Sequence, residues 1–304
     1  IVVAERDSHI DAQPLGAISG RNPVQREIHA DLADASARGE ENLFRHVRRL
    51  VEHRPSYITC TYGAGGSTQG KTLEIVARVQ SEFRLPVATH LTCVGRTVDQ
   101  LRDYLQQAVD ADSQNVVALR GDPPQGDKSF RPVEGGLRYA NELVALVRGE
   151  FPALGIAVGG YPETHQEAPS PADDLENLKR KVDAGADVVI TQLFYDNEDF
   201  LRFRDRCDAL GIGVPIVPGV LPVTNFAQIE RIAALCGARL PVGFASDLKS
   251  AGDDKQAQFR VGVDFAAAQC SALVECGVSG LHFYVLNRSE AANEVLSRVT
   301  LPGR

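Results

Sequence analysis

Short runs of β-branched and other apolar residues alternate along the chain with longer stretches of amphipathic, helical periodicity. Seven runs have the length and composition of buried parallel strands, at residues 57–61, 87–92, 115–119, 156–159, 188–193, 214–217 and 280–284. Helical stretches lie between these runs. This order predicts an α/β fold, and its repetition along one chain is typical of a (β/α)₈ TIM barrel.

The predicted helices carry recognisable start and stop signals. Thr97 and Gln100 have the spacing of a capping box, in which each side chain accepts a hydrogen bond from a free backbone donor. Ser170 followed by Pro171 predicts an N-cap with proline at the first helical position, and the helix that follows should end at Gly185. Because no repeat or low-complexity linker divides the chain, we expect a single domain.

A first strand is not evident in the sequence. The helix predicted over 40–52 should follow one, yet residues 21–39 are typical of helix or loop and contain only two β-branched residues, Val24 and Ile28. We therefore expect an N-terminal segment of unclear structure over residues 1–38 and the barrel over 39–304.

Composition narrows the class of protein. The 304 residues are 43% hydrophobic and 24% charged, as in globular domains, and the net charge of -8 argues against a nucleic-acid partner. No apolar run has the length of a membrane span and no signal-peptide pattern opens the chain, so we expect a cytoplasmic protein without a membrane partner. The six cysteines form no C-x-x-C pair, which favours buried free thiols over disulfides. The chain has no methionine, which suggests that it is not the complete native one.

Candidate chemistry is expected at the carboxyl ends of the strands, where barrels build their active sites. The polar positions just past or near these ends are Thr61 with Tyr62, His90, Arg120 to Asp122, Tyr161 to His165, Gln192 and Arg288. Glycine at 63 and 121 allows a ligand to approach the backbone closely. No group of histidine, cysteine and acidic residues has metal-ligand spacing, so we expect no metal.

Several longer motifs contain these positions. They are Thr-Tyr-Gly-Ala at 61–64, His-Leu-Thr-Cys at 90–93, Ala-Leu-Arg-Gly-Asp-Pro-Pro at 118–124, Tyr-Pro-Glu-Thr-His-Gln-Glu-Ala at 161–168, Leu-Lys-Arg-Lys-Val-Asp-Ala-Gly-Ala at 178–186, Ile-Thr-Gln-Leu-Phe at 190–194, Pro-Gly-Val-Leu-Pro-Val at 218–223 and Leu-His-Phe-Tyr-Val-Leu-Asn-Arg at 281–288. Together and in this order, from about residue 39 to 288, they resemble methylenetetrahydrofolate reductase in its bacterial, barrel-only form.

The resemblance implies an enzyme of one-carbon and methionine metabolism that reduces 5,10-methylenetetrahydrofolate to 5-methyltetrahydrofolate, with hydride from NADH or NADPH passing through FAD in a ping-pong cycle. The flavin-binding residues that it implies are Thr61, Tyr62, Ala64, His90, Arg120, Gly121, Asp122, Ala140, Tyr161, His165, Asp174, Asn177, Arg180 and Lys181. Asp122 and Gln192 are implied in catalysis, and Asp122, Gln192, Gln228 and Arg288 in binding a tetrahydrofolate derivative. A homo-oligomer is also implied.

Taken singly, these residues have ordinary structural explanations. Lys179, Arg180 and Lys181 are typical of a solvated basic helix face, and lone histidines such as His90 and His165 are usually structural. Their joint occurrence at the ends of successive strands favours the functional interpretation.

One departure from the family concerns the general acid. The family's first strand carries a Phe-Glu-Phe-Phe-Pro-Pro block, whose glutamate protonates N10 of the folate; a gap-free alignment puts Ala30 at that position. Three explanations remain open. The chain omits a stretch near Ser36, which would also account for the missing strand; or Glu27, Asp31 or Asp34 supplies the carboxylate; or the protein reduces folate poorly.

Two other functions are compatible with parts of the sequence. A non-catalytic or impaired barrel that binds flavin or folate is compatible with the missing glutamate. Residues 65–72 match the phosphate-binding pattern G-x-x-x-x-G-K-[ST] of nucleotide hydrolases. That alternative lacks a later strand that ends in a Mg²⁺-binding aspartate. The chain also lacks the G-x-G-x-x-G pattern of a separate dinucleotide-binding domain, so a nicotinamide would bind transiently over the flavin.

Overall fold

Eight parallel strands close into a barrel in which each strand pairs with its neighbours in the chain and β1 pairs with β8. The computed structural model describes residues 25–31, 37–61, 69–123, 129–286 and 288–300. The strands are β1 Gln25–Asp31, β2 Tyr57–Thr61, β3 Val87–Thr92, β4 Asn115–Leu119, β5 Gly155–Gly160, β6 Val188–Leu193, β7 Ile216–Val220 and β8 Gly280–Tyr284. This confirms the predicted (β/α)₈ barrel.

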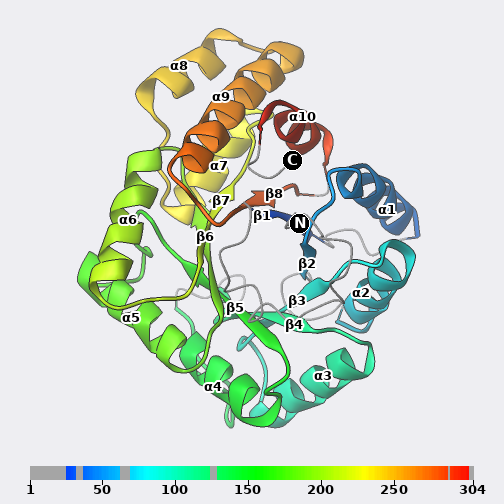
Figure 1. Cartoon of the computed structure of the whole chain (residues 1–304). Helices are drawn as coiled ribbons and strands as arrows, with labels where there is room; N and C mark the ends of the chain where they lie inside the picture. Colours follow the sequence, from blue (N-terminus) through cyan, green and yellow to red (C-terminus); the bar gives the residue numbers. More distant parts are fainter. Residues whose placement is uncertain (1–24, 32–36, 62–68, 124–128, 287, 301–304) are drawn as a thin grey trace.

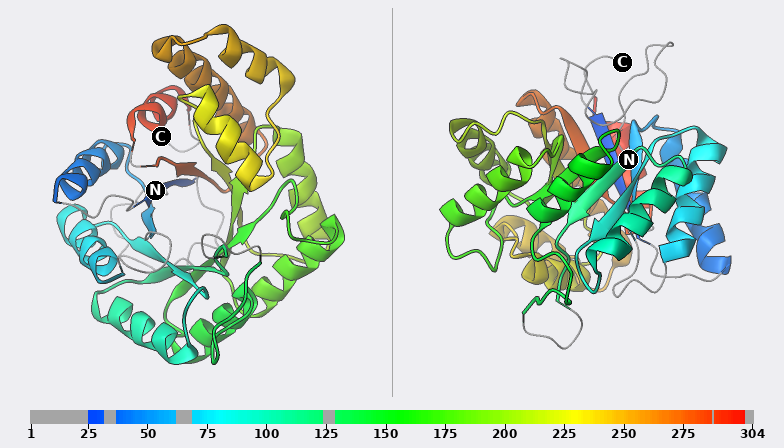
Figure 2. Two further views of the ribbon diagram at one scale, coloured as in Figure 1. Left: turned by 180° about the vertical axis from the view of Figure 1, so that it is seen from behind. Right: turned by 90° about the horizontal axis from the view of Figure 1, so that it is seen from below.

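Helices surround the ring of strands, as Figure 1 shows in a view along the barrel. They are α1 Ala37–Val51, α2 Gln69–Phe83, α3 Val98–Asp110, α4 Ala140–Glu150, α5 Pro171–Asp183, α6 Asn197–Ala209, α7 Phe226–Cys236, α8 Val242–Ser250, α9 Lys255–Glu275 and α10 Glu290–Arg298. The additional helix α8 packs on α9 outside the ring. Viewed from below, helices flank the strands on both sides (Figure 2).

The helix boundaries follow the predicted signals. Thr97 and Gln100 form the expected capping box at the start of α3, with hydrogen bonds of 3.3 Å and 3.0 Å. Ser170 accepts a hydrogen bond from the backbone N–H of Asp173 and caps α5. The helix α5 ends two residues before Gly185, which adopts a positive φ of 116°.

The core has two main layers. Side chains inside the ring form a small cluster that includes Tyr57, Val117 and Ile190, while a larger cluster fills the space between the strands and the helices. A third cluster joins the end of β6 to α7 and α8. All six cysteines lie among the described residues and none of them is in a disulfide; four are buried, Cys236 is half-buried and Cys276 is exposed.

The first strand corrects the sequence analysis. β1 lies within the stretch that the pattern predicted as helix or loop, so that prediction is wrong for these seven residues. Pairing with β2 on one edge and β8 on the other satisfies the backbone groups of a segment with weak intrinsic strand preference. The barrel therefore begins before the expected boundary at residue 39, and no omitted stretch is needed to supply a first strand.

A smaller difference concerns β7. The apolar run predicted a strand over 214–217. The strand instead begins two residues later, at Ile216, and ends three residues later, at Val220. Pairing of Gly219 with both Leu193 and His282 extends the strand past Pro218.

Candidate active site

A cavity of about 390 Å³ lies at the carboxyl ends of the strands. Its lining comes from every strand unit from β2 to β6 and from β8: Thr61, His90, Val117, Leu119, Arg120, Gly121, Asp122, Gly159, Gly160, Tyr161, His165, Ile190, Gln192, His282 and Tyr284. Eight of the residues expected from the sequence therefore lie together: Thr61, His90, Arg120, Gly121, Asp122, Tyr161, His165 and Gln192. The volume is in the usual range for a small-molecule site.

The backbone after β4 requires glycine at position 121. Gly121 has a φ of 86°, which side chains rarely adopt. A Cβ atom there would lie 2.7 Å from Cγ2 of Val94 and 3.0 Å from Cβ of Thr92. The chain thus exposes bare backbone in the lining of the cavity, between the side chains of Arg120 and Asp122.

Arg120 lies against the β5–α5 loop (161–170). Its guanidinium pairs with both carboxylate oxygens of Glu167, and its Nε donates to the carbonyl of Gly121 at 3.1 Å. The pKa of Arg120 is raised, chiefly by the hydrogen bonds to Glu167, and that of Glu167 is lowered by the same bonds. The pair joins the ends of two neighbouring strand units.

Tyr161 and His165 form the part of the β5–α5 loop that lines the cavity. Their rings meet edge to face with centroids 4.6 Å apart. Nδ1 of His165 accepts a hydrogen bond from the backbone N–H of Glu167 at 3.1 Å, and the backbone N–H of His165 donates to the carboxylate of Asp174 at 2.9 Å. Burial lowers the pKa of His165 and raises that of Tyr161 to about 12, so both are neutral at pH 7.

Lys181 approaches the site from α5. Its ammonium group donates a hydrogen bond to the carbonyl of Gly159 and lies 5.9 Å from the ring centroid of Tyr161. Burial lowers the pKa of Lys181 to about 8, and the nearby Asp174 opposes this shift. A half-buried ammonium group with one carboxylate nearby suits an anionic ligand.

Other expected residues lie elsewhere. Asp174, Asn177 and Arg180 follow one another on α5, where Arg180 donates to Asn177 at 2.6 Å; Asn177 and Arg180 are exposed and do not line the cavity. Ala140, the first residue of α4, does not line it either. Tyr62 and Ala64 lie outside the described residues, as does Asp34.

Gln228 and Arg288 come together in a second, smaller pocket. It lies between the segments 221–232 and 284–292 and is mainly apolar, with contributions from Leu221, Ile229 and Leu286. Its volume is about 40 Å³. Tyr284 lines both spaces, so the pocket adjoins the larger cavity.

Two residues of β8 were missed by the sequence analysis. His282 and Tyr284 line the cavity, with their rings edge to face at 4.7 Å, and the Tyr284 hydroxyl donates to the carbonyl of Thr191 at 2.8 Å. Gly219 on β7 makes this possible, because a Cβ there would lie 2.7 Å from the tyrosine ring. The two-residue spacing of His282 and Tyr284 on a strand was the available signal, since it puts both on one face.

Two further properties concern only the described residues. Among them, no group of three or more histidine, cysteine or acidic side chains is arranged to hold a metal ion. Nor is any helix among them long and apolar enough to cross a membrane.

Two solved structures with a similar fold are described with folate-related compounds. An uncharacterized protein from Clostridium thermocellum, described as binding two copies of 5-methyl-5,6,7,8-tetrahydrofolic acid, superposes with a TM-score of 0.59 at 14% identity, covering 90% of this chain and 93% of that one. Dihydropteroate synthase from Xanthomonas albilineans with 4-aminobenzoic acid gives 0.53 at 14% identity, with 91% and 92% covered. At this identity, the likeness establishes the fold alone.

Sequence relatives are closer. The chain is 41% identical to 5,10-methylenetetrahydrofolate reductase of Escherichia coli, covering 91% of this chain and 90% of that protein. It is 39% identical to methylenetetrahydrofolate reductase (NADH) 1 of Arabidopsis thaliana over 86% of this chain, but spans only 46% of that relative. A family model described as methylenetetrahydrofolate reductase matches residues 34–300, including the phosphate-loop-like pattern at 65–72. The chain therefore belongs to the methylenetetrahydrofolate reductase family.

Proposed function

We propose that this protein reduces 5,10-methylenetetrahydrofolate to 5-methyltetrahydrofolate, with FAD in the larger cavity and NADH or NADPH as the hydride donor. The observation that carries the proposal is the meeting of eight expected residues, from five strand units, around one cavity. Membership of the family supports the same reaction.

The residues of the cavity fit a flavin. Bare backbone at Gly121 allows the edge of a planar ring to approach, and Thr61, His90 and Arg120 add polar groups around it. On the outer side, Lys181 offers a positive charge for a diphosphate, with Asp174, Asn177 and Arg180 farther along α5. Bound there, FAD would accept hydride from the nicotinamide and deliver it to the folate.

The folate is assigned to the side of the cavity that adjoins the second pocket. Asp122 and Gln192 would hydrogen-bond the pterin. Gln228 and Arg288, in the lining of the small pocket beyond Tyr284, would contact the remainder of the molecule where it leaves the larger cavity. The nicotinamide and the folate would use the site one after the other, which gives a ping-pong cycle. The names of the plant relatives favour NADH as the donor.

A carboxylic acid must still protonate N10 of the folate so that its five-membered ring opens and hydride can add. We assign this role to Asp31, because β1 pairs Asp31 with Thr61, which lines the cavity. Glu27 pairs instead with Tyr57, in the buried layer inside the ring. Of the carboxylates on this strand, Asp31 is thus the one at the catalytic end.

The acid is tested by comparing Asp31→Asn with Glu27→Gln. We expect Asp31→Asn to lower kcat for folate reduction by about 10²–10⁴-fold, the range for loss of a general acid, while NADH still reduces the flavin at the wild-type rate. Glu27→Gln should change neither rate. Equal folate reduction by Asp31→Asn and wild type would remove Asp31 from the mechanism.

The function itself is tested by spectroscopy of the purified protein. We expect a flavin absorbance that bleaches on anaerobic addition of NADH and returns on addition of methylenetetrahydrofolate. Bleaching without return would favour the alternative of an impaired flavin-binding barrel, which the departure at Ala30 suggests. A protein that takes up no added FAD would overturn the proposal. Light scattering of the same sample tests the homo-oligomer that belongs to the proposal, and cell fractionation tests its cytoplasmic location.

A further inference from the structure

The β5–α5 loop has one side in the cavity and another side attached to the outside of the barrel. Tyr161 and His165 line the cavity, whereas Glu163 and Gln166, between and beside them, contact other elements. Thr164 in the same loop has a φ of 79°, a strained conformation for a residue other than glycine. Such a conformation persists only where the surroundings hold it.

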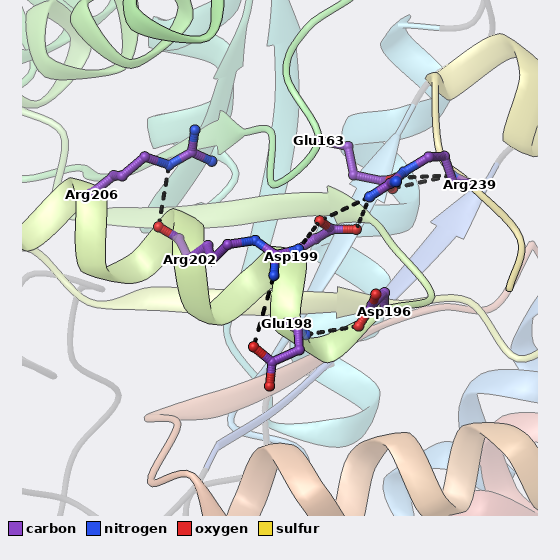
Figure 3. Close-up of polar contacts among 7 residues, drawn as sticks. All are labelled: Glu163, Asp196, Glu198, Asp199, Arg202, Arg206 and Arg239. Carbon is purple, nitrogen blue, oxygen red and sulfur yellow. Dashed lines mark hydrogen bonds and ion pairs between the residues drawn. The ribbon is translucent and has the colours of Figure 1, made fainter.

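Figure 3 shows the first attachment, an ion-pair network on the outer face. Glu163 accepts hydrogen bonds from the backbone N–H and from Nε of Arg239, each at 3.0 Å. The same guanidinium donates to both oxygens of Asp199 on α6, at 3.0 Å and 2.8 Å. Arg202 donates to Asp199 as well, at 2.6 Å, but makes no contact with the loop in this network.

Burial makes this network sensitive to the loss of its central cation. The side chains of Glu163 and Asp199 are 10% and 9% exposed, while that of Arg239 is 71% exposed. Burial raises the pKa of Glu163, Asp199 adds to the rise, and the hydrogen bonds from Arg239 oppose it. Without Arg239, two nearly buried carboxylates would face each other, and Glu163 would lose its ion pair.

A second attachment joins the loop to α7. Nε2 of Gln166 donates to the carbonyls of Ala234 and Leu235, at 2.9 Å and 3.1 Å, in the last turn of that helix. Gly237 caps α7 with a φ of 73°, and a Cβ there would lie 3.0 Å from Cγ of Gln166. The amide thus fits against a turn that leaves room for it.

We infer that Glu163, Gln166, Asp199 and Arg239 form an outer clamp that positions Tyr161 and His165 in the cavity, with Arg239 as its central positioning residue. None of the four lines either of the two spaces proposed to hold the ligands. The inference rests on the proposed function in one respect, namely that the ligand whose affinity the clamp controls is the flavin.

The test compares Arg239→Met with a matched control, Arg202→Met. Both arginines pair with Asp199, but only Arg239 holds the loop. We expect Arg239→Met to weaken FAD binding, measured by quenching of flavin fluorescence, about tenfold, the factor that corresponds to 1.4 kcal/mol. Arg202→Met should bind FAD as the wild type does. Equal losses in the two variants, or none in Arg239→Met, would overturn the clamp.

A second readout needs no flavin. In the apoprotein, burial and Arg120 lower the pKa of His165, and the carboxylates of Asp174 and Glu167 oppose this shift. Release of the loop should raise this pKa toward 6.5 in Arg239→Met, as followed by NMR titration with His165→Gln for assignment. If wild-type protein binds no FAD, the proposed function fails, while an unchanged His165 pKa in Arg239→Met would separately refute the clamp.

Gln166→Met is a second variant that tests the clamp if Arg239→Met does not fold. It leaves no charge unpaired and removes an exposed amide, so the barrel should fold normally. We expect the same two changes in smaller degree, with weaker FAD binding and a higher His165 pKa. Wild-type values of both in Gln166→Met, together with failure of Arg239→Met to fold, would overturn the positioning role.

Discussion

The two adjoining spaces at the carboxyl end of the barrel are built in different ways. The larger cavity takes its polar groups from the last few residues of strands or from residues shortly after them, such as His90, Gln192, Arg120 and Tyr161. The smaller pocket is formed by the loops after β7 and β8 and the first turns of α7 and α10, and it is mainly apolar, with Thr224, Asn225, Gln228 and Arg288 among its few polar residues. Strand ends therefore hold many polar groups in fixed positions around the larger cavity, whereas loops and helix starts line a small and mainly apolar pocket.

The comparison predicts that the larger cavity depends most on its backbone. Gly121→Ala forces a Cβ to within 2.7 Å of Val94 at a φ of 86°. The segment 120–122 must move, and we expect FAD affinity to fall roughly 100-fold, equivalent to about 2.8 kcal/mol. Titration of the apoprotein with FAD measures this.

Gly135→Ala is the matched control for Gly121→Ala. Gly135 also has a positive φ, 71°, but a Cβ there would have no atom within 4 Å, and the residue lies outside the cavity lining. Backbone strain should lower the thermal stability of both variants. FAD affinity should fall only in Gly121→Ala and stay at the wild-type value in Gly135→Ala. Equal FAD affinity in the two variants would show that the cavity does not need bare backbone at Gly121.

A substitution in the smaller pocket should weaken binding of the folate and leave binding and reduction of the flavin unchanged. Gln228→Ala removes one hydrogen-bonding side chain from α7, so we expect KM for methylenetetrahydrofolate to rise about five- to tenfold, near the upper end for one hydrogen bond. Flavin reduction by NADH should be unchanged. Glu230→Ala, an exposed position on the same helix, is the control. A slower reaction with NADH in Gln228→Ala would mean that the two spaces are not specialised in this way.

The same contrast explains what could be predicted from the sequence. The apolar runs of β2 to β6 predict both the strand and its carboxyl end, so Arg120 and Tyr161, just past strands, and Gln192, near the end of β6, could be placed at one rim from the sequence. Gln228 and Arg288 came only from the family resemblance, because no periodicity marks a pocket between a loop and the start of a helix.

Two other features depended on tertiary contacts. β1 has few strand-forming residues, and its conformation is stabilised by pairing on both edges, which a local pattern does not report. Arg239 lies far from Glu163 and Asp199 in the sequence, so the clamp is visible only once α6, α7 and the β5–α5 loop are assembled.

The smallest predicted effect concerns the charge of Lys181 at the outer side of the cavity. Because burial holds its pKa near 8, the ammonium group loses its proton as pH rises through that value, and its attraction for a diphosphate disappears. FAD affinity should therefore fall about fivefold between pH 7 and pH 9. In the same protein without FAD, the unfolded chain binds the proton more tightly than the folded chain does, so stability should increase from about pH 8 toward 10.5. Lys181→Met should bind FAD more weakly at pH 7 and lose both pH dependences. A wild-type FAD affinity that is constant over this range would show that Lys181 does not face the diphosphate, and would leave the charge of the site to Arg180.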